Sequence, residues 1–444
     1  MAERTDDDAS SRGGRLGCML LLGAAAVVLI GSVTAGCLAF TDRFPGDSMD
    51  IAWEAPADGK GSEQGNGAWL VGDTLVRSRF DAASGYDART GERVWDYRPP
   101  GRSQICVAEA DVDSAVLLVA RDDENRPAAS RRELCTTVAA IDMKNGREIW
   151  RAPLPAPGDD PRFERRLVAA GGGLAVIADK GLRALDVRTG QSRWTAAVPA
   201  NCVPGKATPA KRRVAAVLAC GDPEKRRTDN GMPEDAELHA AAFAPTTGAL
   251  LWSTPLGDRE PVRWDKISSV LSADPVVVSA ASDSGDKASG AYYSFGADGR
   301  PHPPIDYDGD NGHLDDKLRV AAVDDTRLYA LAGYYRKGGT RHRAVAFDLA
   351  TGELAWKADL DNLPGVNMRL QDGKLTVIVK GSATSAVPDE DLYVLDAATG
   401  KERDSRSFHD AVAPADEVFE HKGLLIVARL GGSAEPVFTA YERS

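Results

Sequence analysis

The chain has 444 residues, of which 43 % are hydrophobic and 27 % are charged. This is the composition of an ordinary globular protein. Its formal net charge of −12 argues against nucleic-acid binding, because that function depends on neutralising phosphates with Lys and Arg.

The first 47 residues predict that the rest of the chain is exported. Residues 16–40 form an apolar run without charges that is long enough to span a bilayer. Residues 1–15 carry three Arg, which favours a short cytoplasmic tail, followed by a single-pass anchor in the cell membrane, a linker at 41–47 and an external domain at 48–444. Two alternatives stay open: a lipoprotein anchored at Cys37, because residues 33–37 approximate a lipobox, and free secretion.

After residue 48 the chain repeats one phrase: a short apolar strand, then Asp-x-x-Thr-Gly, then a Trp four residues past the Gly. The Asp can accept hydrogen bonds from the backbone of a tight turn, and the Gly supplies the positive φ of a bulged hairpin. We expect each Trp to wedge between adjacent sheets. The residues of this blade motif are Asp87, Gly91, Trp95, Asp142, Gly146, Trp150, Asp186, Gly190, Trp194, Gly248, Trp252, Asp348, Gly352, Trp356, Asp396 and Gly400. A degenerate copy at 295–299 fills the one gap in the series.

Upstream of each phrase lies a second recurring element, an apolar strand that we expect to be the inner strand of a sheet. These strands lie at 74–76, 115–120, 174–178, 214–219, 275–278, 327–331, 375–379 and 424–428. The two chain ends complete the last unit, since the segment with Trp53 resembles the strand after a turn phrase and the segment with Tyr441 the strand before one. The repeat therefore predicts an all-β, eight-bladed β-propeller of four-stranded blades, closed by the N-terminal strand.

Four cysteines lie in the predicted propeller: Cys106, Cys135, Cys202 and Cys220. Four cysteines allow three disulfide connectivities. Pairing within a blade is favoured, because Cys202 and Cys220 flank one predicted hairpin and Cys106 and Cys135 both belong to one predicted blade. Disulfides of this kind agree with export.

The sequence shows no motif of a known catalytic class, such as Gly-x-Ser-x-Gly, His-Glu-x-x-His or a phosphate-binding loop. Residues 306–312 carry alternating carboxylates, as a calcium loop does, but Asn311 and Lys317 stand where Gly and Glu are needed. We therefore expect a polar loop that connects blades, with calcium binding as the alternative. The basic clusters 211–213 and 225–227 are expected to be solvated turns, with contact to an anionic polymer as the alternative.

The phrase Ala-x-Asp-x-x-Thr-Gly-x-x-x-Trp resembles the PQQ-like (quinoprotein-type) propeller repeat, and the whole arrangement resembles the outer-membrane assembly factor BamB and its relatives. In that family the motif residues are structural. The family also includes dehydrogenases that bind pyrroloquinoline quinone and calcium, and these usually carry a vicinal Cys pair that this sequence lacks. The resemblance therefore implies no cofactor, no PQQ and no enzymatic activity.

Together these features predict a non-catalytic, membrane-anchored, extracytoplasmic propeller that acts as a protein-binding scaffold in the cell envelope, with an envelope or membrane protein as its partner. Residues 121–134, 222–237 and the 306 loop are the expected contact surface. Two alternatives remain: a small-ligand sensor that signals through a partner in trans, and a quinoprotein-type enzyme.

Overall fold

The computed structural model describes residues 48–57, 65–101, 103–122, 135–154, 167–179, 181–222, 236–257, 269–281, 290–314, 320–336, 339–360, 364–380, 390–431 and 435–443. Within these ranges every regular element is a β-strand, and no helix there is long and apolar enough to cross a membrane. The predicted tail, anchor and linker, together with Cys37, lie outside the described residues, as do most of 121–134 and 222–237 and all of 225–227.

Five sheets each consist of four consecutive antiparallel strands. Their strands are β2 (Gly67–Val71), β3 (Thr74–Ser78), β4 (Ala83–Asp87) and β5 (Arg93–Tyr97); β6 (Ile105–Asp111), β7 (Val116–Arg121), β8 (Thr137–Asp142) and β9 (Glu148–Pro153); β10 (Leu167–Gly171), β11 (Leu174–Ala178), β12 (Leu182–Asp186) and β13 (Ser192–Ala196); β14 (Cys202–Pro209), β15 (Val214–Cys220), β16 (Glu237–Phe243) and β17 (Leu250–Pro255); and β18 (Ser269–Ala273), β19 (Val276–Ala281), β20 (Gly290–Phe295) and β21 (Ile305–Asp306).

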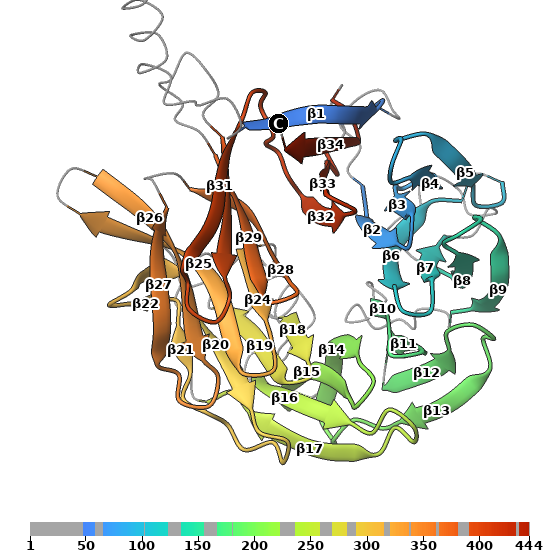
Figure 1. The fold of residues 1–444 in the computed structure, drawn as a ribbon. Helices are drawn as coiled ribbons and strands as arrows, with labels where there is room; N and C mark the ends of the chain where they lie inside the picture. The colour runs from blue at the N-terminus through green and yellow to red at the C-terminus, as the bar shows by residue number, and fades with distance from the viewer. Residues whose placement is uncertain are drawn as a thin grey trace, which may run out of the picture.

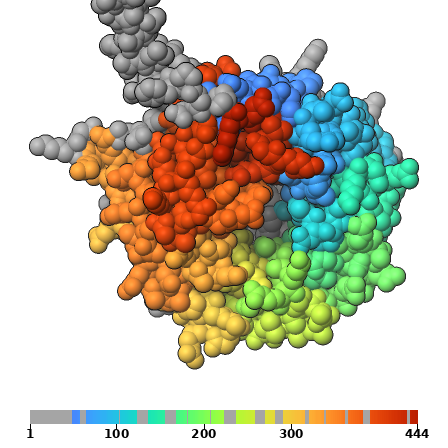
Figure 2. Space-filling view, in the orientation of Figure 1, coloured from blue at the N-terminus to red at the C-terminus, as the bar shows by residue number. Residues whose placement is uncertain are grey.

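The other two sheets are larger. One contains β22 (Asp308–Gly309), β23 (Gly312–Leu314), β24 (Ala321–Val323), β25 (Arg327–Arg336), β26 (Gly339–Asp348) and β27 (Leu354–Leu360). The last contains β28 (Gly365–Gln371), β29 (Lys374–Val379), β30 (Asp391–Asp396), β31 (Glu402–Phe408), β32 (Glu417–His421), β33 (Leu424–Ala428), β34 (Phe438–Arg443) and β1 (Ser48–Ala55). Figure 1 shows the sheets succeeding one another around a central axis, and the colours follow the same circuit in the space-filling view (Figure 2).

Eight strands lie nearest the axis, because each contacts the next in succession: β2, β6, β10, β14, β18, β24, β28 and β32. The prediction that the long apolar strands are innermost is therefore wrong, since strands such as β7 and β11 are second in their sheets. Every residue of β7 is buried. Its continuous apolar run reflects burial of both faces between neighbouring sheets rather than proximity to the axis.

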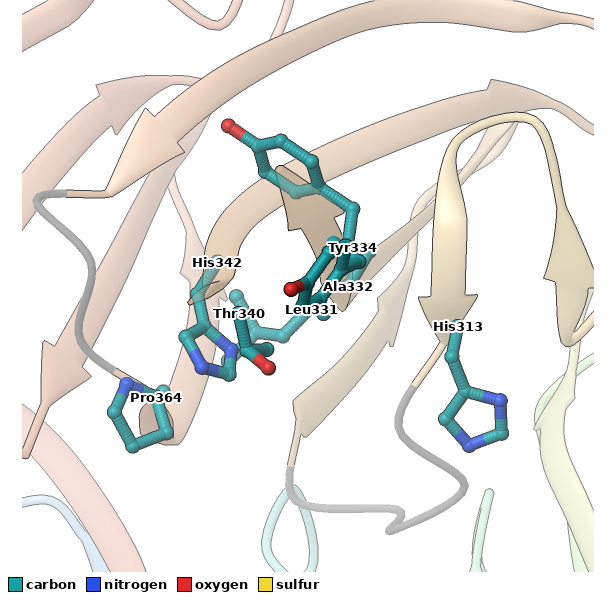
Figure 3. A pocket seen from close by; sticks show the side chains of 10 residues that line it. His313, Leu331, Ala332, Tyr334, Thr340, His342 and Pro364 are labelled. Carbon is teal, nitrogen blue, oxygen red and sulfur yellow. The ribbon is translucent and has the colours of Figure 1, made fainter. Parts of the chain in front are cut away.

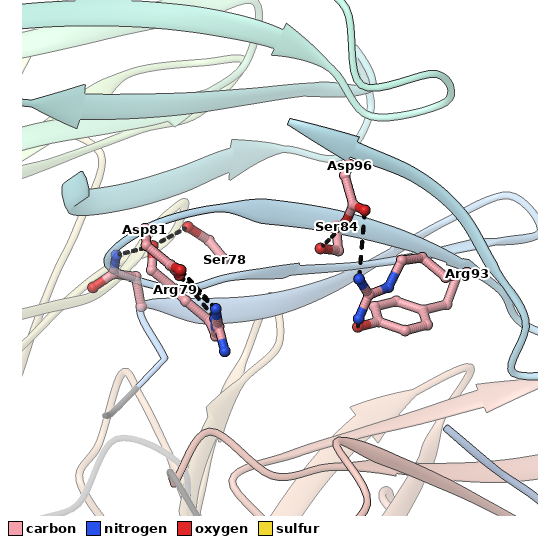
Figure 4. Close-up of polar contacts among 8 residues, drawn as sticks. Ser78, Arg79, Asp81, Ser84, Arg93 and Asp96 are labelled. Carbon is pink, nitrogen blue, oxygen red and sulfur yellow. Dashed lines mark hydrogen bonds and ion pairs between the residues drawn. The ribbon is translucent and has the colours of Figure 1, made fainter. Parts of the chain in front are cut away.

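The repeated phrase forms the turn between the third and fourth strands of a sheet. In the β4–β5 turn, Asp87 Oδ1 accepts hydrogen bonds from the backbone N–H groups of Arg89 (2.8 Å) and Thr90 (3.2 Å). Gly91 closes the turn with a φ of 72°, a conformation that a residue with a Cβ rarely adopts. Figure 4 shows how the same sheet is held further along its strands, where Ser84 donates a hydrogen bond to Asp96 across the β4–β5 pair (2.6 Å).

Each motif Trp packs on the turn of the next sheet. The Trp95 indole N–H donates to the Met143 carbonyl (3.1 Å), and its ring lies so close over Gly146 that an added Cβ would be 2.5 Å from a ring carbon. The other pairs with this arrangement are Trp53 over Gly91, Trp150 over Gly190, Trp194 over Gly248, Trp252 over Gly299 and Trp356 over Gly400. The degenerate sheet lacks the Trp, and Pro303 takes its place against Gly352.

The first and last described strands, β1 and β34, meet in one sheet. β1 pairs antiparallel with β34, with Ile51 opposite Tyr441 and Trp53 opposite Ala440. At its start β1 also pairs with β31 in a parallel register, Ser48 opposite Ser407. Strand β34 follows β32 and β33 and has β1 as its outer neighbour. In the four-stranded sheets, the third strand likewise has a fourth strand as its outer neighbour.

Both disulfides join cysteines that are close in the sequence: Cys106 pairs with Cys135, 29 residues away, and Cys202 with Cys220, 18 residues away. These are the local pairings that the sequence favours. Each disulfide ties the first strand of its sheet to the base of a long connection, after β7 in one sheet and after β15 in the other.

The turn carboxylates contribute pH-dependent stability. A hydrogen bond from the Arg193 side chain, followed by bonds from the Thr189 backbone and hydroxyl, lowers the pKa of Asp186 to about 2. Since an unfolded Asp has a pKa of about 3.9, this stabilisation is complete above about pH 4 and is lost as the pH falls through about 2.

We therefore expect Asp186→Asn, which keeps an oxygen acceptor but removes the charge, to lower the urea midpoint at pH 7. The difference from the unaltered protein should shrink as the pH falls from about 4 to about 2. Urea unfolding followed by fluorescence at several pH values measures this difference. A difference that stays constant down to pH 2 would rule out the charge as its cause.

Candidate functional site

The longest hairpin of the structure, β25–β26, extends beyond its neighbouring strands. Both strands have ten residues and stay paired up to Arg336 opposite Gly339. On one side β23 pairs no further than Gly333, and on the other β27 pairs no further than His342. Residues 334–336 and 339–341 therefore form a two-stranded tip, here called the ribbon, which protrudes at the left of Figure 1.

A pocket of about 540 Å³ lies at the base of the ribbon. It is lined by His313, Leu331, Ala332, Gly333, Tyr334, Tyr335, Thr340, His342, Pro364 and Gly365. His313, Gly333 and His342 stand opposite one another on three adjacent strands, so the two imidazoles flank a position without a side chain. Figure 3 shows the imidazoles on opposite sides of the pocket, with Leu331 and Ala332 between them.

Two glycines, Gly333 and Gly365, shape this pocket. Gly333 has no side chain to fill the space between the two imidazoles, and an added Cβ there would be 3.7 Å from the His342 ring. Gly365 starts β28 in direct contact with the Leu331 side chain, which sets the far wall. The mixture of imidazole, phenol, hydroxyl and aliphatic groups is typical of binding surfaces.

The two ribbon tyrosines differ in how they are held. The Tyr334 hydroxyl donates to Asp359 (3.0 Å), and the Arg343 guanidinium lies 3.3 Å from the centre of the Tyr334 ring. Arg343 also pairs with Asp359 (3.6 Å). Tyr335, on the opposite face, is 82 % exposed, more than any other large hydrophobic residue of the described chain. Tyr334 is thus fixed, and Tyr335 is presented to solvent.

The acidic stretch 306–312 adjoins this pocket and connects the β18–β21 sheet to the next sheet. Ile305 and Tyr307 are buried and alternate with exposed Asp306 and Asp308, the pattern of a half-buried strand, and the stretch forms β21, β22 and the start of β23. The predicted connection between two sheets is confirmed: Asp306 ends β21, Asp308 begins β22 in the next sheet, and residues 310–311 form a turn. Asp308 Oδ1 accepts a hydrogen bond from His313 Nδ1 (2.8 Å). In the described part of the chain, no group of three or more His, Cys, Asp or Glu is placed to hold a metal ion.

The basic cluster 211–213 is paired with acidic residues on other sheets. The Lys211 ammonium lies 2.6 Å from Asp113, and Arg212 contacts both Asp274 and Asp325. Hydrogen bonding to Asp274 raises the pKa of Arg212. These residues all lie in or beside the tight turns that follow the first strands, so charged side chains bridge several sheets close to the axis.

Three glycines make this bridging possible. The β10–β11 turn, residues 171–173, has no side chains, and an added Cβ on Gly172 would be 2.6 Å from the Ala210 backbone. The neighbouring turn can therefore approach closely, and Lys211 reaches past it to Asp113 on the sheet beyond. The prediction of a simple solvated turn misses these ion pairs.

The comparisons with known proteins agree with a repeat propeller. The family described as "Outer membrane protein assembly factor BamB" matches residues 84–285 and 239–428. No curated protein matches the chain.

Three solved structures illustrate the likeness. BamB from Moraxella catarrhalis is 18 % identical, with 89 % of this chain and 97 % of that chain covered and a TM-score of 0.47. The computationally designed Ika8 protein is 12 % identical over 88 % and 99 % of the two chains, with a TM-score of 0.54. Quinohemoprotein alcohol dehydrogenase from Comamonas testosteroni is 13 % identical over 89 % and 76 %, with a TM-score of 0.45. At 12 % identity the likeness to Ika8 concerns the fold alone.

Proposed function

The chain belongs to the family described as outer membrane protein assembly factor BamB, and from this premise we propose that it is a non-catalytic scaffold that binds another protein of the cell envelope. The observation that carries the proposal is the ribbon, which presents an 82 % exposed Tyr335 beside a pocket of about 540 Å³. Tyrosine and arginine are enriched among the residues that dominate binding energy at interfaces. A ribbon stiffened by Tyr334 and Arg343 loses little conformational entropy on binding.

We further propose that the scaffold is an eight-bladed ring closed by β1. Two observations support this closure. β1 pairs with β34 from Met49 to Ala55, and Trp53 lies over Gly91 as Trp95 lies over Gly146. The closing strand thus supplies to the first sheet the same Trp contact that Trp95 supplies to the second.

We also propose that the domain works outside the cytoplasm, held at the membrane by residues 16–40. The two disulfides support an oxidising compartment, since such bonds persist there and are rare in the cytosol. The identity of the partner is part of what the following experiment determines.

Position-specific photo-crosslinking in the native cells tests the scaffold function. We expect a photoreactive residue in place of Tyr335 in the full chain to capture one protein reproducibly. Val94, which is 53 % exposed on β5, is the matched control and should capture none. Equal capture at both positions would contradict a role for the ribbon, and no capture at either would favour a small ligand in the pocket.

A further inference from the structure

The ribbon has an open edge with different chemistry on its two faces, and this suggests what kind of segment it binds. Resting on the scaffold function, we propose that the edge of β26 at residues 339–341 takes an additional β-strand from the partner, in which acidic side chains alternate with aromatic or aliphatic ones. Edge strands are ready templates for such pairing.

The open edge follows from the register. β27 covers β26 only as far as His342, opposite Leu360, and no described strand pairs beyond it on that side. Backbone groups of residues 339–341 on that edge therefore face away from the sheet. A partner strand placed there would continue the line of β27.

The apolar side chains of the partner would face the pocket. Because successive strand residues point to opposite faces, Tyr335, Thr340 and His342 share one face of the ribbon with Gly333. This is the face that lines the pocket at its base. An aromatic or aliphatic side chain on the added strand would pack between Tyr335 and the pocket wall.

The acidic side chains of the partner would face the other side. Arg336 and Arg341 lie on that face together with Tyr334, and neither forms an ion pair with any residue in the described ranges. Asp359 on the same face is already engaged by Arg343 and Tyr334. Two guanidinium groups that have no ion-pair partner within the described part of the chain, on a protein with net charge −12, are complementary to an acidic segment.

Fluorescence anisotropy with the full chain and short labelled peptides tests the proposal. The first probe alternates Glu with Phe, the second Lys with Phe, and the third Glu with Ser. We expect the Glu/Phe peptide to bind at least about tenfold more tightly than either of the others, because only it satisfies both faces. Its affinity should fall as salt is added.

The double variant Arg336→Glu, Arg341→Glu should weaken Glu/Phe binding by about tenfold, since two attractions become two repulsions. The control Arg98→Glu, Arg147→Glu changes the net charge equally at exposed positions that flank strands of other sheets, and it should bind as the unaltered protein does. Equal binding of the Glu/Phe and Lys/Phe peptides, or no effect of the ribbon variant, would overturn the inference. If Tyr335 still captures a protein in cells, the scaffold function survives that result; if it captures none, both fail.

Discussion

Replacing Trp95 with Ala is expected to lower the free energy of unfolding by about 3–5 kcal/mol, the usual cost of removing a buried Trp. Trp95 is only 9 % exposed and makes two contacts with the next sheet, its ring over Gly146 and its indole N–H to the Met143 carbonyl. Urea unfolding followed by circular dichroism measures the loss.

A pair of Phe variants separates packing from the hydrogen bond. Trp252 packs over Gly299 as Trp95 packs over Gly146, but its indole nitrogen has no hydrogen-bond partner among the described residues. We expect Trp95→Phe to cost about 1 kcal/mol more than Trp252→Phe, the net value of one hydrogen bond. Equal costs would show that the indole N–H adds nothing to the contact.

Replacing Gly146 with Ala is expected to cost about 2–5 kcal/mol. Gly146 has a φ of 71°, which disfavours any Cβ by about 1–2 kcal/mol, and the Cβ would also be 2.5 Å from Trp95. The stability of the variant is read from the same urea titration.

Gly373 provides the matched control. Its φ is 70°, and an added Cβ would meet nothing within 4 Å, so Gly373→Ala carries the backbone cost without the clash. The Gly146 variant should be less stable than the Gly373 variant by about 1–3 kcal/mol. If the two variants lose the same stability, the close approach of Trp95 does not exclude a side chain at position 146.

The repeated turns could be predicted from the sequence because their chemistry is local. An Asp that accepts from the next residues and a Gly with positive φ are determined within one hairpin, as at Asp87 and Gly91. Membership of the PQQ-like, BamB-type family is confirmed. It could be predicted because the repeated phrase is itself the family's local sequence pattern. The order of strands in a sheet is not local, and there the burial of β7 between sheets was mistaken for nearness to the axis.

The candidate site was missed because it depends on relative strand lengths. The sequence predicts a strand at 327–331 and another before Asp348, but not that β25 and β26 extend beyond both neighbouring strands to form the ribbon. The paired tyrosines at 334–335, among Arg and Gly, are the one local signal that could have indicated it. The contact of Lys211 with Asp113 depends on how three sheets meet, and no local pattern predicts it.

The central claim, that the ribbon is the partner-binding surface, is tested most directly by removing it. Gly333 and His342 are paired, so an Asn-Gly turn between them can replace residues 334–341 and leave the rest of the sheet intact. Titration calorimetry with the protein captured at Tyr335 should show affinity at least about thirtyfold weaker for this variant, with the urea midpoint unchanged. Full affinity in a variant of unchanged stability would contradict the account.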